Sequence, residues 1–246
     1  MMKVDILYIT YNRIQTTMLT LPTLLESTEY PFALTIVDNG SEDGTQEYLK
    51  ETVDNHTRSD KITLIINHTN QGLSGPTNEF WKKSQAELVG KIDNDILVEN
   101  AWLEKLVNTH ITIPNVAVVG GFHFPPEVFN YEKCKHNIHQ YNDIKILRQP
   151  HIGGNYLAKR QILLKNGLLE EPGTANFKLG GWTGYQQRLS KKSYIVGYYY
   201  PLIYFEHLHL APGRYYKKVR KMSKKKYLRW ERTAGEEMIY TKWSWD

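Results

Sequence analysis

The fold is decided by residues 4–13, which read VDILYITYNR. This short, largely apolar run is rich in β-forming side chains and ends in the polar cluster Thr10-Tyr11-Asn12-Arg13. A run of this length that is closed by polar residues is typical of a strand buried on both faces, as in a parallel sheet. We therefore predict a buried strand over 4–10 with polar side chains at its carboxyl end.

The same signal recurs along the chain and alternates with helical spacing. Further strands are predicted over 34–37, 62–66, 88–92 and 116–119, and helices over 17–27, 44–53, 78–85 and 102–110. This alternation predicts an α/β fold, with a mostly parallel sheet flanked by helices. After Gly121 the alternation stops, and we expect the aromatic, His-rich stretch 122–149 to pass over the sheet. We predict one domain over 1–212 and a C-terminal appendage over 213–246.

Composition and charge narrow the class of protein. A chain of 246 residues that is 41% hydrophobic is long and apolar enough to fold around a core, which excludes a disordered protein. The single cysteine, Cys134, cannot form an internal disulfide, and no apolar run approaches the roughly 20 residues that cross a bilayer. We expect a cytoplasmic protein whose contact with the inner face of the membrane, if it has one, is peripheral.

Polar clusters follow four of the predicted strands. Ligands of open α/β sheets bind at the carboxyl ends of the strands, so these clusters converge on one crevice. No phosphate-binding loop of the Gly-x-x-x-x-Gly-Lys-Ser/Thr type and no Gly-x-Gly-x-x-Gly follows a strand. Instead, Asp93 and Asp95 lie beyond a strand end, where carboxylates can hold Mg²⁺ or Mn²⁺ that also binds diphosphate oxygens. A solvated turn is the alternative for this pair. Asp38 either accepts a hydrogen bond from a base or caps the helix that starts near Gly44.

Four segments in order carry a resemblance to a known family. They are Ile9-Thr10-Tyr11-Asn12, the run from Ile36 to Thr45, Asn70-x-Gly72 with Asn78, and Asp93-x-Asp95. This succession resembles family 2 glycosyltransferases, which have the Rossmann-like GT-A fold. The resemblance implies that Thr10, Tyr11 and Asn12 border the nucleotide, that Asp38 pairs with its base, and that Asn70 and Gly72 line the diphosphate side. It also implies that Asp93 serves the ribose and Asp95 the metal, with a UDP-sugar as the favoured donor.

The second half matches this family less well. The run from His151 to Arg160 resembles the family's glycine-containing strand, which implies that Gly153, Gly154 and Asn155 face the sugar and the acceptor; a strand with a glycine bulge is the alternative. Trp182 joins this acceptor side. Many members then place a Glu-Asp pair at a helix start as the general base. Here residues 180–188 contain no acid. Glu170 and Glu171 are weak candidates for the base, and their alternative is a surface turn.

Late histidines supply a further metal ligand in many GT-A enzymes. His207 and His209 follow the aromatic run 198–204 and alternate on one face of a strand. A neutral imidazole suits Mn²⁺ in a mixed site with carboxylates. We predict His207 as the ligand and keep His209 as the second choice. An ordinary, partly buried histidine is the alternative for each.

The predicted appendage is strongly basic. Residues 214–232 carry ten basic side chains and one acidic side chain, so the rest of a chain of net charge +5 is mildly acidic. Its aromatic residues fall on one side of a helical projection, which predicts a basic amphipathic helix. Such a helix can lie on an anionic membrane beside a lipid-linked acceptor, hold a glycan or nucleic-acid acceptor, or pack on the body of the protein.

These features predict a metal-dependent glycosyltransferase that uses a nucleotide-sugar donor and a hydroxyl acceptor. One alternative is a protein of the same fold that binds nucleotide-sugars or nucleic acid without transfer, because the acid pair is missing. A nucleotidyltransferase is a second alternative, although no glycine-rich, lysine-bearing signature follows the first strand.

Overall fold

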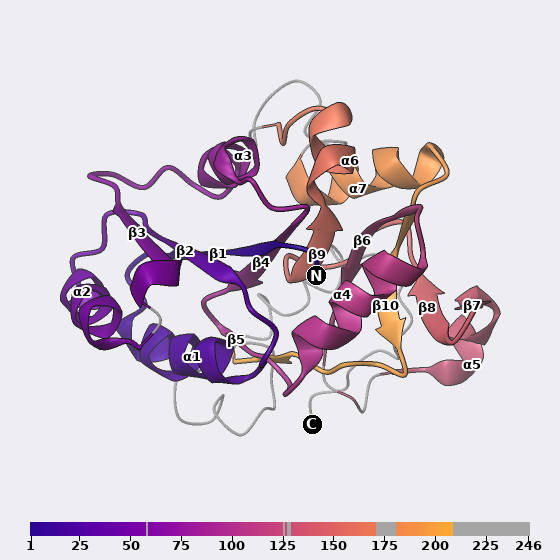
Figure 1. Cartoon of the computed structure of the whole chain (residues 1–246), viewed down its shortest axis with the longest axis horizontal. Coiled ribbons are helices and arrows are strands. Elements are labelled where there is room, and N and C mark those ends of the chain that lie inside the picture. Colours follow the sequence, from indigo (N-terminus) through magenta and orange to yellow (C-terminus); the bar gives the residue numbers. More distant parts are fainter. Residues whose placement is uncertain (58, 125, 127–128, 171–180, 209–246) are drawn as a thin grey trace, which may run out of the picture.

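The computed structural model describes residues 1–57, 59–124, 126, 129–170 and 181–208 (Figure 1). Glu171, His209 and the predicted basic appendage lie outside these residues. Within the described part, no helix is long and apolar enough to cross a membrane.

Strands and helices alternate through the first half of the described chain. The strands are β1 (Val4–Thr10), β2 (Ala33–Asp38), β3 (Ile62–Ile66), β4 (Leu88–Asp93), β5 (Ile96–Leu97), β6 (Val116–Gly120), β7 (Ile138–Tyr141), β8 (Ile144–Arg148), β9 (Tyr156–Lys159), β10 (Ile195–Tyr200) and β11 (Glu206–His207). The helices are α1 (Ile14–Glu26), α2 (Thr45–Asn55), α3 (Ser74–Lys83), α4 (Trp102–Thr112), α5 (Tyr131–Cys134), α6 (Arg160–Lys165) and α7 (Gly181–Lys191), with short 3-10 turns η1 (Ser59–Lys61) and η3 (Lys135–Asn137).

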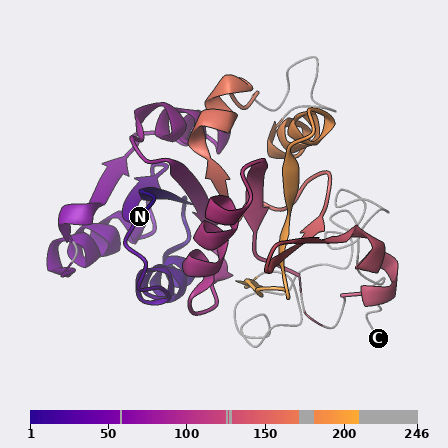
Figure 2. The ribbon, with the colours of Figure 1, turned by 45° about the vertical axis from the view of Figure 1, so that its right-hand side comes forward.

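One large sheet runs through the described residues in the order β3-β2-β1-β4-β9-β6-β10-β8-β7. The pairings among β1 to β4, and between β6 and β10, are parallel. Helices α1, α2 and α4 cover one face, and α3, α6 and α7 cover the other (Figure 1; Figure 2 shows the same layers turned by 45°). The predicted α/β sheet flanked by helices is confirmed.

Burial on both faces explains why β1 is almost continuously apolar. Ile6 and Tyr8 join the core beneath α1 and α4, whereas Leu7 and Ile9 join the core that includes Trp81 of α3 and Leu189 of α7. Alternate residues of a strand point to opposite faces, so a strand with helices on both sides needs apolar side chains at nearly every position. This arrangement leaves only the strand ends for polar groups.

The stretch 122–149 is a correction to the sequence analysis. It extends the edge of the sheet, because β8 pairs antiparallel with β10 and β7 pairs antiparallel with β8. Ile144 and Ile146 are buried while Lys145 is exposed between them. Leu147, on the opposite face of β8, is buried in the second core. The pattern is too short to stand out from the surrounding aromatic and histidine residues.

Two later elements bring distant segments to the carboxyl ends of β1 and β4. β9 runs antiparallel between β4 and β6, so the residues just before it lie beside the end of β4. β11 pairs antiparallel with β5, with His207 opposite Ile96, directly after Asp95. The second half of the chain therefore contributes side chains to the same edge of the sheet as the first half.

Candidate active site at the carboxyl ends of the strands

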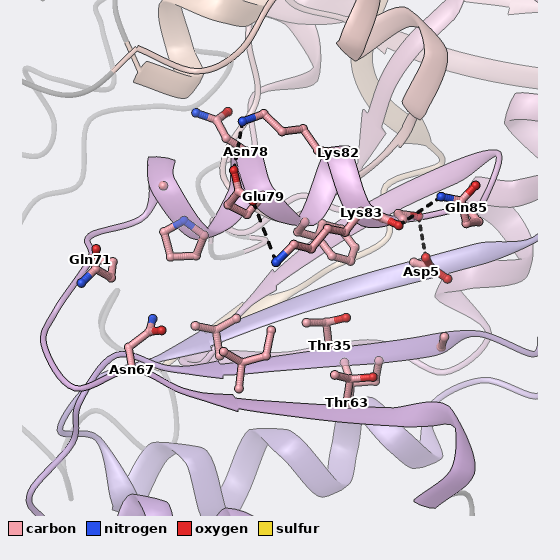
Figure 3. A pocket seen from close by; sticks show the side chains of 18 residues that line it. Asp5, Thr35, Thr63, Asn67, Gln71, Asn78, Glu79, Lys82, Lys83 and Gln85 are labelled. Carbon is pink, nitrogen blue, oxygen red and sulfur yellow. Dashed lines mark hydrogen bonds and ion pairs between the residues drawn. The ribbon is translucent and has the colours of Figure 1, made fainter.

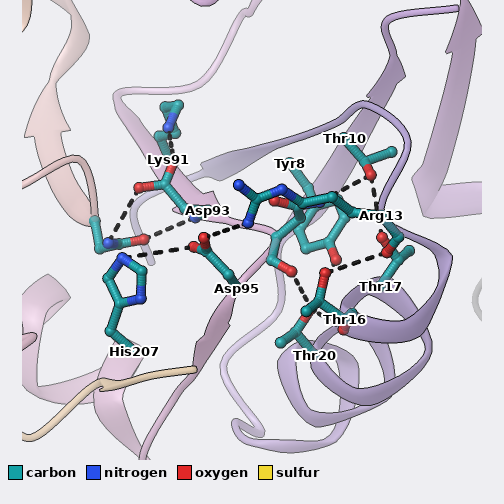
Figure 4. Close-up of polar contacts among 12 residues, drawn as sticks. Tyr8, Thr10, Arg13, Thr16, Thr17, Thr20, Lys91, Asp93, Asp95 and His207 are labelled. Atoms are coloured by element: carbon teal, nitrogen blue, oxygen red, sulfur yellow. Dashed lines mark hydrogen bonds and ion pairs between the residues drawn. The ribbon is translucent and has the colours of Figure 1, made fainter. Parts of the chain in front are cut away.

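The Asp93-Asn94-Asp95 turn is anchored by its central residue. Asn94 is buried, its Nδ2 donates to Thr10 Oγ1 at 2.9 Å, and its carbonyl accepts from Thr20 Oγ1 at 3.1 Å. Thr20 in turn contacts the hydroxyl of Tyr8 at 2.7 Å (Figure 4). Inward anchoring of Asn94 leaves the two aspartates, which are partly exposed, on the outer side of the turn.

Asp95 lies between two basic side chains. Arg13 Nη1 donates to Asp95 Oδ2 at 2.8 Å, and His207 Nε2 faces Asp95 Oδ1 at 3.9 Å (Figure 4). Leu208 N also donates to the Asp95 carbonyl at 2.8 Å, which fixes the end of β11 on this turn. The structure thus places the predicted ligand His207 beside the predicted metal aspartate.

Asp93 is held by three neighbours. Lys91, which precedes it by two residues on the same face of β4, forms an ion pair with Asp93 Oδ1. Asn155 Oδ1 accepts from Asp93 N at 2.7 Å, and Asn155 Nδ2 lies 3.3 Å from Asp93 Oδ2. A Cβ added to Gly154 would lie 2.7 Å from Asp93 Oδ2, so the close approach of the segment before β9 favours glycine.

Charge around Asp93 keeps its carboxyl ionised. Burial raises its pKa, but the ammonium of Lys91, by charge and by hydrogen bond, outweighs this effect with smaller help from His207 and His123. The pKa of Asp93 is therefore below its usual range. An ionised, oriented carboxylate at this point can accept hydrogen bonds from hydroxyl groups.

A divalent metal fits this edge only if a ligand completes its coordination. Among the described residues, no group of three or more His, Cys, Asp and Glu side chains is arranged to hold a metal. Asp95 and His207 present one carboxylate and one imidazole, a donor set that suits Mn²⁺. Mg²⁺ and Mn²⁺ sites of this kind take their other oxygens from phosphates and water.

Asp38 is fully buried in its own turn. Its Oδ1 accepts from the backbone N–H groups of Gly40 and Ser41 at 3.1 and 2.8 Å, and its Oδ2 accepts from Ser41 Oγ at 2.5 Å. The capping of α2 belongs to Asp43, whose Oδ1 accepts from Thr45 N at 3.2 Å. The alternative role of Asp38 as the cap of that helix is therefore wrong.

The loops after β1 and β2 are tied together. Asn12 has a left-handed backbone, with φ of 48°, and its N–H donates to Ser41 Oγ at 2.8 Å. Its Oδ1 accepts from Glu42 N at 2.8 Å. Tyr11 is 43% exposed, whereas Thr10 is buried and its hydroxyl bonds to Thr17 Oγ1 at 3.1 Å. Of these three predicted residues, Tyr11 and Asn12 are exposed and Thr10 is buried.

The loop after β3 joins the same network. Asn70 Oδ1 accepts from Gly72 N at 2.8 Å, which closes a turn in which Gly72 has a φ of 67°. Asn39 Nδ2 donates to the Gly72 carbonyl at 2.8 Å, and Asn67 Nδ2 donates to Asn39 Oδ1 at 2.9 Å. Asn39 therefore holds the loops after β2 and β3 side by side.

A groove of about 780 Å³ opens next to this loop (Figure 3). It lies between α3 and the face of β2 and β3, where Thr35 and Thr63 point into it. On α3, Lys82 and Lys83 pair with Glu79 at 2.9 and 3.9 Å. Neither aspartate of the Asp93-Asn94-Asp95 turn lines this groove, so the groove is separate from the predicted metal site.

On the predicted acceptor side, the glycines are not on a strand, as the sequence analysis expected, but in the segment just before β9, which α7 holds in place. The buried Gln186 accepts from Ile152 N at 3.0 Å and donates to the Ile152 carbonyl at 2.8 Å. Trp182 Nε1 donates to the Gly153 carbonyl at 2.8 Å, and its ring stacks on Tyr156 with centroids 4.1 Å apart. Gly153, Gly154, Asn155 and Trp182 thus come together, as predicted.

Glu170 is placed at the start of α3. Its Oε1 lies 3.8 Å from Arg188 Nη1, and its carbonyl accepts from Ser74 Oγ at 3.5 Å. Glu170 and Arg188 are both partly exposed, so this is a solvent-screened pair. These contacts place Glu170 by α3 and α7.

Three residues that contribute to this site were missed by the sequence analysis, and a fourth, Arg13, was placed in the polar cluster after the first strand but given no role. Lys91 precedes Asp93 by the two residues that put both on one face of the strand. Gln186 gave no signal, because one amide in a helix is unremarkable. His123 packs against Gly153, and burial lowers its pKa to about 3, with His207 adding to the effect.

The sequence comparisons identify the family. A model of glycosyl transferase family 2 matches residues 5–177. The chain belongs to this family. Among relatives in the family, a glucosyl-dolichyl phosphate glucuronosyltransferase of Haloferax volcanii is 30% identical over 139 residues, 53% of this chain and 43% of that protein. Glycosyltransferase AglE of the same organism is 32% identical over 98 residues, 39% of this chain and 31% of that protein. The chain spans less than half the length of either relative.

Solved structures confirm the GT-A fold for this family 2 chain. Mannosyltransferase PcManGT from Pyrobaculum calidifontis, in complex with GDP-Man and Mn²⁺, has a TM-score of 0.63 at 19% identity, covering 87% of this chain and 58% of that one. GalNAc-T7, solved with UDP, GalNAc and Mn²⁺, has a TM-score of 0.61 at 14% identity, covering 84% of this chain and 44% of that one. Both similar structures carry a divalent metal.

Proposed function

We propose that this protein is a metal-dependent glycosyltransferase that moves a sugar from a nucleotide-sugar, by preference a UDP-sugar, to a hydroxyl acceptor. The observation that carries the proposal is the placement of Asp95 between Arg13 and His207, next to Asp93, at the carboxyl edge of a family 2 chain. Mn²⁺ or Mg²⁺ held by Asp95 and His207 would neutralise the charge of the departing nucleoside diphosphate.

The residues of this chain take distinct parts in donor binding. Asp93, kept ionised by Lys91, accepts from the ribose hydroxyls, and Tyr11 offers an exposed ring on which the base stacks. Asp38 Oδ2 accepts only the Ser41 hydroxyl among the described contacts, and because Asp38 is fully buried, its pairing with a base N–H requires the turn of residues 38–41 to open. Asn12 holds the loops beside the base, and the Thr10 hydroxyl ties the end of β1 to Thr17 of α1.

The diphosphate and the sugar lie on either side of the metal in this proposal. Asn70 and Gly72 form a tight turn on the diphosphate side. Gly153, Gly154 and Asn155 face the sugar, because Gly154 allows the segment before β9 to approach Asp93, and Trp182 borders the acceptor. The bond from the sugar to the diphosphate breaks with its electron pair on the diphosphate, and the acceptor oxygen forms the new bond after losing its proton to a base.

Glu170 and Glu171 remain our candidates for that base. Conversion of each to glutamine tests them, because an amide cannot accept the proton of the acceptor hydroxyl. A base role predicts a large loss of transfer with donor binding retained. Equal loss of donor binding, or no loss of transfer, removes the residue from this role.

A second function has one observation in its favour. Gln186 stands in the helix where many family members carry acids, and its amide is used to hold Ile152. A protein that binds nucleotide-sugars or nucleic acid without transfer is consistent with that arrangement. Release of nucleoside diphosphate separates the two functions, because a binding protein retains affinity without turnover.

The experiment is a measurement of nucleoside diphosphate release from UDP-, GDP- and dTDP-sugars, with and without Mn²⁺. Wild type is compared with Asp95→Asn and with Asp60→Asn. Asp60 is exposed at the amino end of β3, so it controls for loss of one negative charge. We expect metal-dependent release from one donor that Asp95→Asn abolishes and Asp60→Asn retains. The proposal would be overturned if the protein bound none of these donors and released no nucleoside diphosphate from any of them.

For the acceptor we propose a lipid-linked glycan. The support is the similarity to a relative named for its action on glucosyl-dolichyl phosphate, together with the basic sequence of residues 214–232. Basic residues near an anionic surface contribute about 1 kcal/mol each. The full chain should sediment with phosphatidylglycerol vesicles. The triple variant Lys224→Gln, Lys225→Gln, Lys226→Gln should remain in the supernatant. Equal sedimentation of both proteins would contradict this contact.

A further inference from the structure

Arg13 is mounted rigidly at the junction of β1 and α1. Its carbonyl accepts from Thr17 N at 2.9 Å and from Thr16 Oγ1 at 3.1 Å, which fixes it as the residue before the helix. The next N–H, that of Ile14, donates to Asp43 Oδ2 at 2.9 Å. The backbone of Arg13 is therefore held from both sides, and its side chain alone is free to change direction.

The guanidinium of Arg13 lies on the carboxylate that we propose as the metal ligand. Its Nη1 donates to Asp95 Oδ2 at 2.8 Å, while His207 faces the other oxygen. A positive charge at this distance opposes the binding of a second cation to the same carboxylate. The guanidinium of Arg13 thus lies where a metal cation would contact the Asp95 carboxylate.

The exposure of the two side chains differs. Arg13 is 37% exposed, whereas Asp95 is 13% exposed, so the guanidinium covers the carboxylate from the solvent side. The bond to Asp95 uses one of several N–H donors of the guanidinium. The planar fork of arginine matches the oxygens of phosphate, which a lysine ammonium meets only as a point charge.

We infer that Arg13 binds the diphosphate of the donor and, before the metal arrives, holds Asp95 in place of the metal. This inference rests on the proposed function and deepens it. With a metal held by Asp95 and His207, Arg13 would leave Asp95 Oδ2 and turn to the diphosphate, which carries the opposite charge. Arg13 therefore weakens the binding of the metal alone and strengthens the binding of the diphosphate when the metal is present.

The two opposite effects give a test that does not depend on turnover. Mn²⁺ binding without nucleotide is measured by the electron paramagnetic resonance signal of free Mn²⁺, and UDP binding at saturating Mn²⁺ is measured by calorimetry. The proteins are wild type, Arg13→Gln, Arg13→Lys and Asp95→Asn. Lys61→Gln is the matched control, because Lys61 is exposed just before β3, at the opposite end of the sheet.

We expect Arg13→Gln to bind Mn²⁺ about three- to tenfold more tightly than wild type, the range of a partly exposed charge-assisted pair. The same variant should bind UDP about tenfold more weakly at saturating Mn²⁺, because a charged donor to the diphosphate is lost. Arg13→Lys should keep the wild-type Mn²⁺ affinity and bind UDP with intermediate affinity. Lys61→Gln should match wild type in both measurements.

The outcomes separate this inference from the function on which it rests. Unchanged or weaker Mn²⁺ binding by Arg13→Gln would overturn the hold on Asp95, and unchanged UDP binding would overturn the diphosphate contact. If Asp95→Asn bound Mn²⁺ as well as wild type, the proposed metal site itself would be wrong. Circular dichroism spectra of the variants confirm that each is folded before binding is compared.

Discussion

His207 Nε2 lies 3.9 Å from Asp95 Oδ1, although the two residues come from opposite halves of the described chain. The short pairing of β11 with β5 produces this approach, because it sets His207 opposite Ile96. Leu208 N bonds to the Asp95 carbonyl, so the backbone and the side chain of the same aspartate are both engaged by β11. The two-residue strand β11 thus brings the second proposed ligand to the metal site.

The first prediction concerns the coupling of His207 and Asp95. His207→Ala should weaken Mn²⁺ binding about tenfold or more, and addition of His207→Ala to Asp95→Ala should cost little further, because two ligands of one ion act as a unit. Mn²⁺ titration of the two single variants and the double variant measures the coupling. His139→Ala, in the exposed part of β7, is the matched control. Strictly additive losses would show that the two residues do not share an ion.

The second prediction concerns the close approach of Gly154 to Asp93. A methyl group at position 154 would lie 2.7 Å from Asp93 Oδ2, and Lys91 and Asn155 keep that carboxylate from moving aside. Gly154→Ala should therefore weaken binding of UDP by about five- to tenfold, on the order of 1 kcal/mol. Isothermal titration with UDP and Mn²⁺ measures the loss.

The control for Gly154→Ala is the same substitution made in the Asp93→Ala variant. In Asp93→Ala the carboxylate is absent, so addition of Gly154→Ala should have no further effect on UDP binding. A loss of the same size in both backgrounds would mean that the methyl group acts on something other than Asp93.

The strands of the first half were predictable because burial on both faces leaves an unbroken apolar run. Residues 4–10 and 62–66 were predicted with the bounds that the structure has, 88–92 is one residue short at its end, and 34–37 is one residue short at each end. The strands β7 and β8 at the far end of the sheet were missed. They have only four and five residues, and neither alternates strictly between buried and exposed positions, so their pattern was too short and too irregular to predict a strand.

The site was predictable where chain order alone brings residues together. Asp93, Asp95 and the loops after β1 to β3 follow parallel strands, whose carboxyl ends must meet at one edge. Lys91 and Arg13 required the further step of asking which charged side chains share a face with the aspartates. The role of Gln186 required tertiary structure, since it depends on the pairing of a side chain with the backbone of Ile152 from another element.

The third prediction concerns pH and the buried His110. Its Nε2 donates to the Leu157 carbonyl at 3.0 Å, and burial lowers its pKa to about 3, with Lys159 adding to the effect. The unfolded chain, with a pKa of about 6.5 for this group, binds more protons below that pH than the folded protein does. The stability is therefore complete above about pH 6.5 and decreases as pH falls, by up to about 1.4 kcal/mol per pH unit.

Urea unfolding between pH 7.5 and 5 measures this dependence. His110→Gln keeps a donor for Leu157 but does not titrate, so its free energy of unfolding should depend less on pH than that of wild type. His123, whose pKa burial also lowers to about 3, contributes the slope that remains in this variant. His139→Gln, exposed on β7, should keep the wild-type slope. An unchanged slope in His110→Gln would contradict a neutral, buried His110.

The last prediction concerns Gln186, which lies in the stretch 180–188 that contains no acid. Its amide both donates to and accepts from the backbone of Ile152, which a carboxylate cannot do because it has no donor. Gln186→Glu should therefore destabilise the protein by about 2–4 kcal/mol at pH 7.5, since a buried charge or an unpaired carbonyl results. Gln161→Glu, exposed on α6, should change stability by less than about 0.5 kcal/mol.

The pH dependence of this variant distinguishes the cause. Burial raises the pKa of a carboxyl group, so the folded variant would bind a proton above about pH 4.3 where the unfolded chain releases it. The difference between Gln186→Glu and wild type should thus shrink as pH falls from 7.5 to 5, because a protonated glutamate donates to Ile152 as glutamine does. A different outcome would be a stable Gln186→Glu variant that releases nucleoside diphosphate faster than wild type at pH 7.5. That result would show that position 186 lies where a general base acts, and that the lack of a base there limits turnover in this chain.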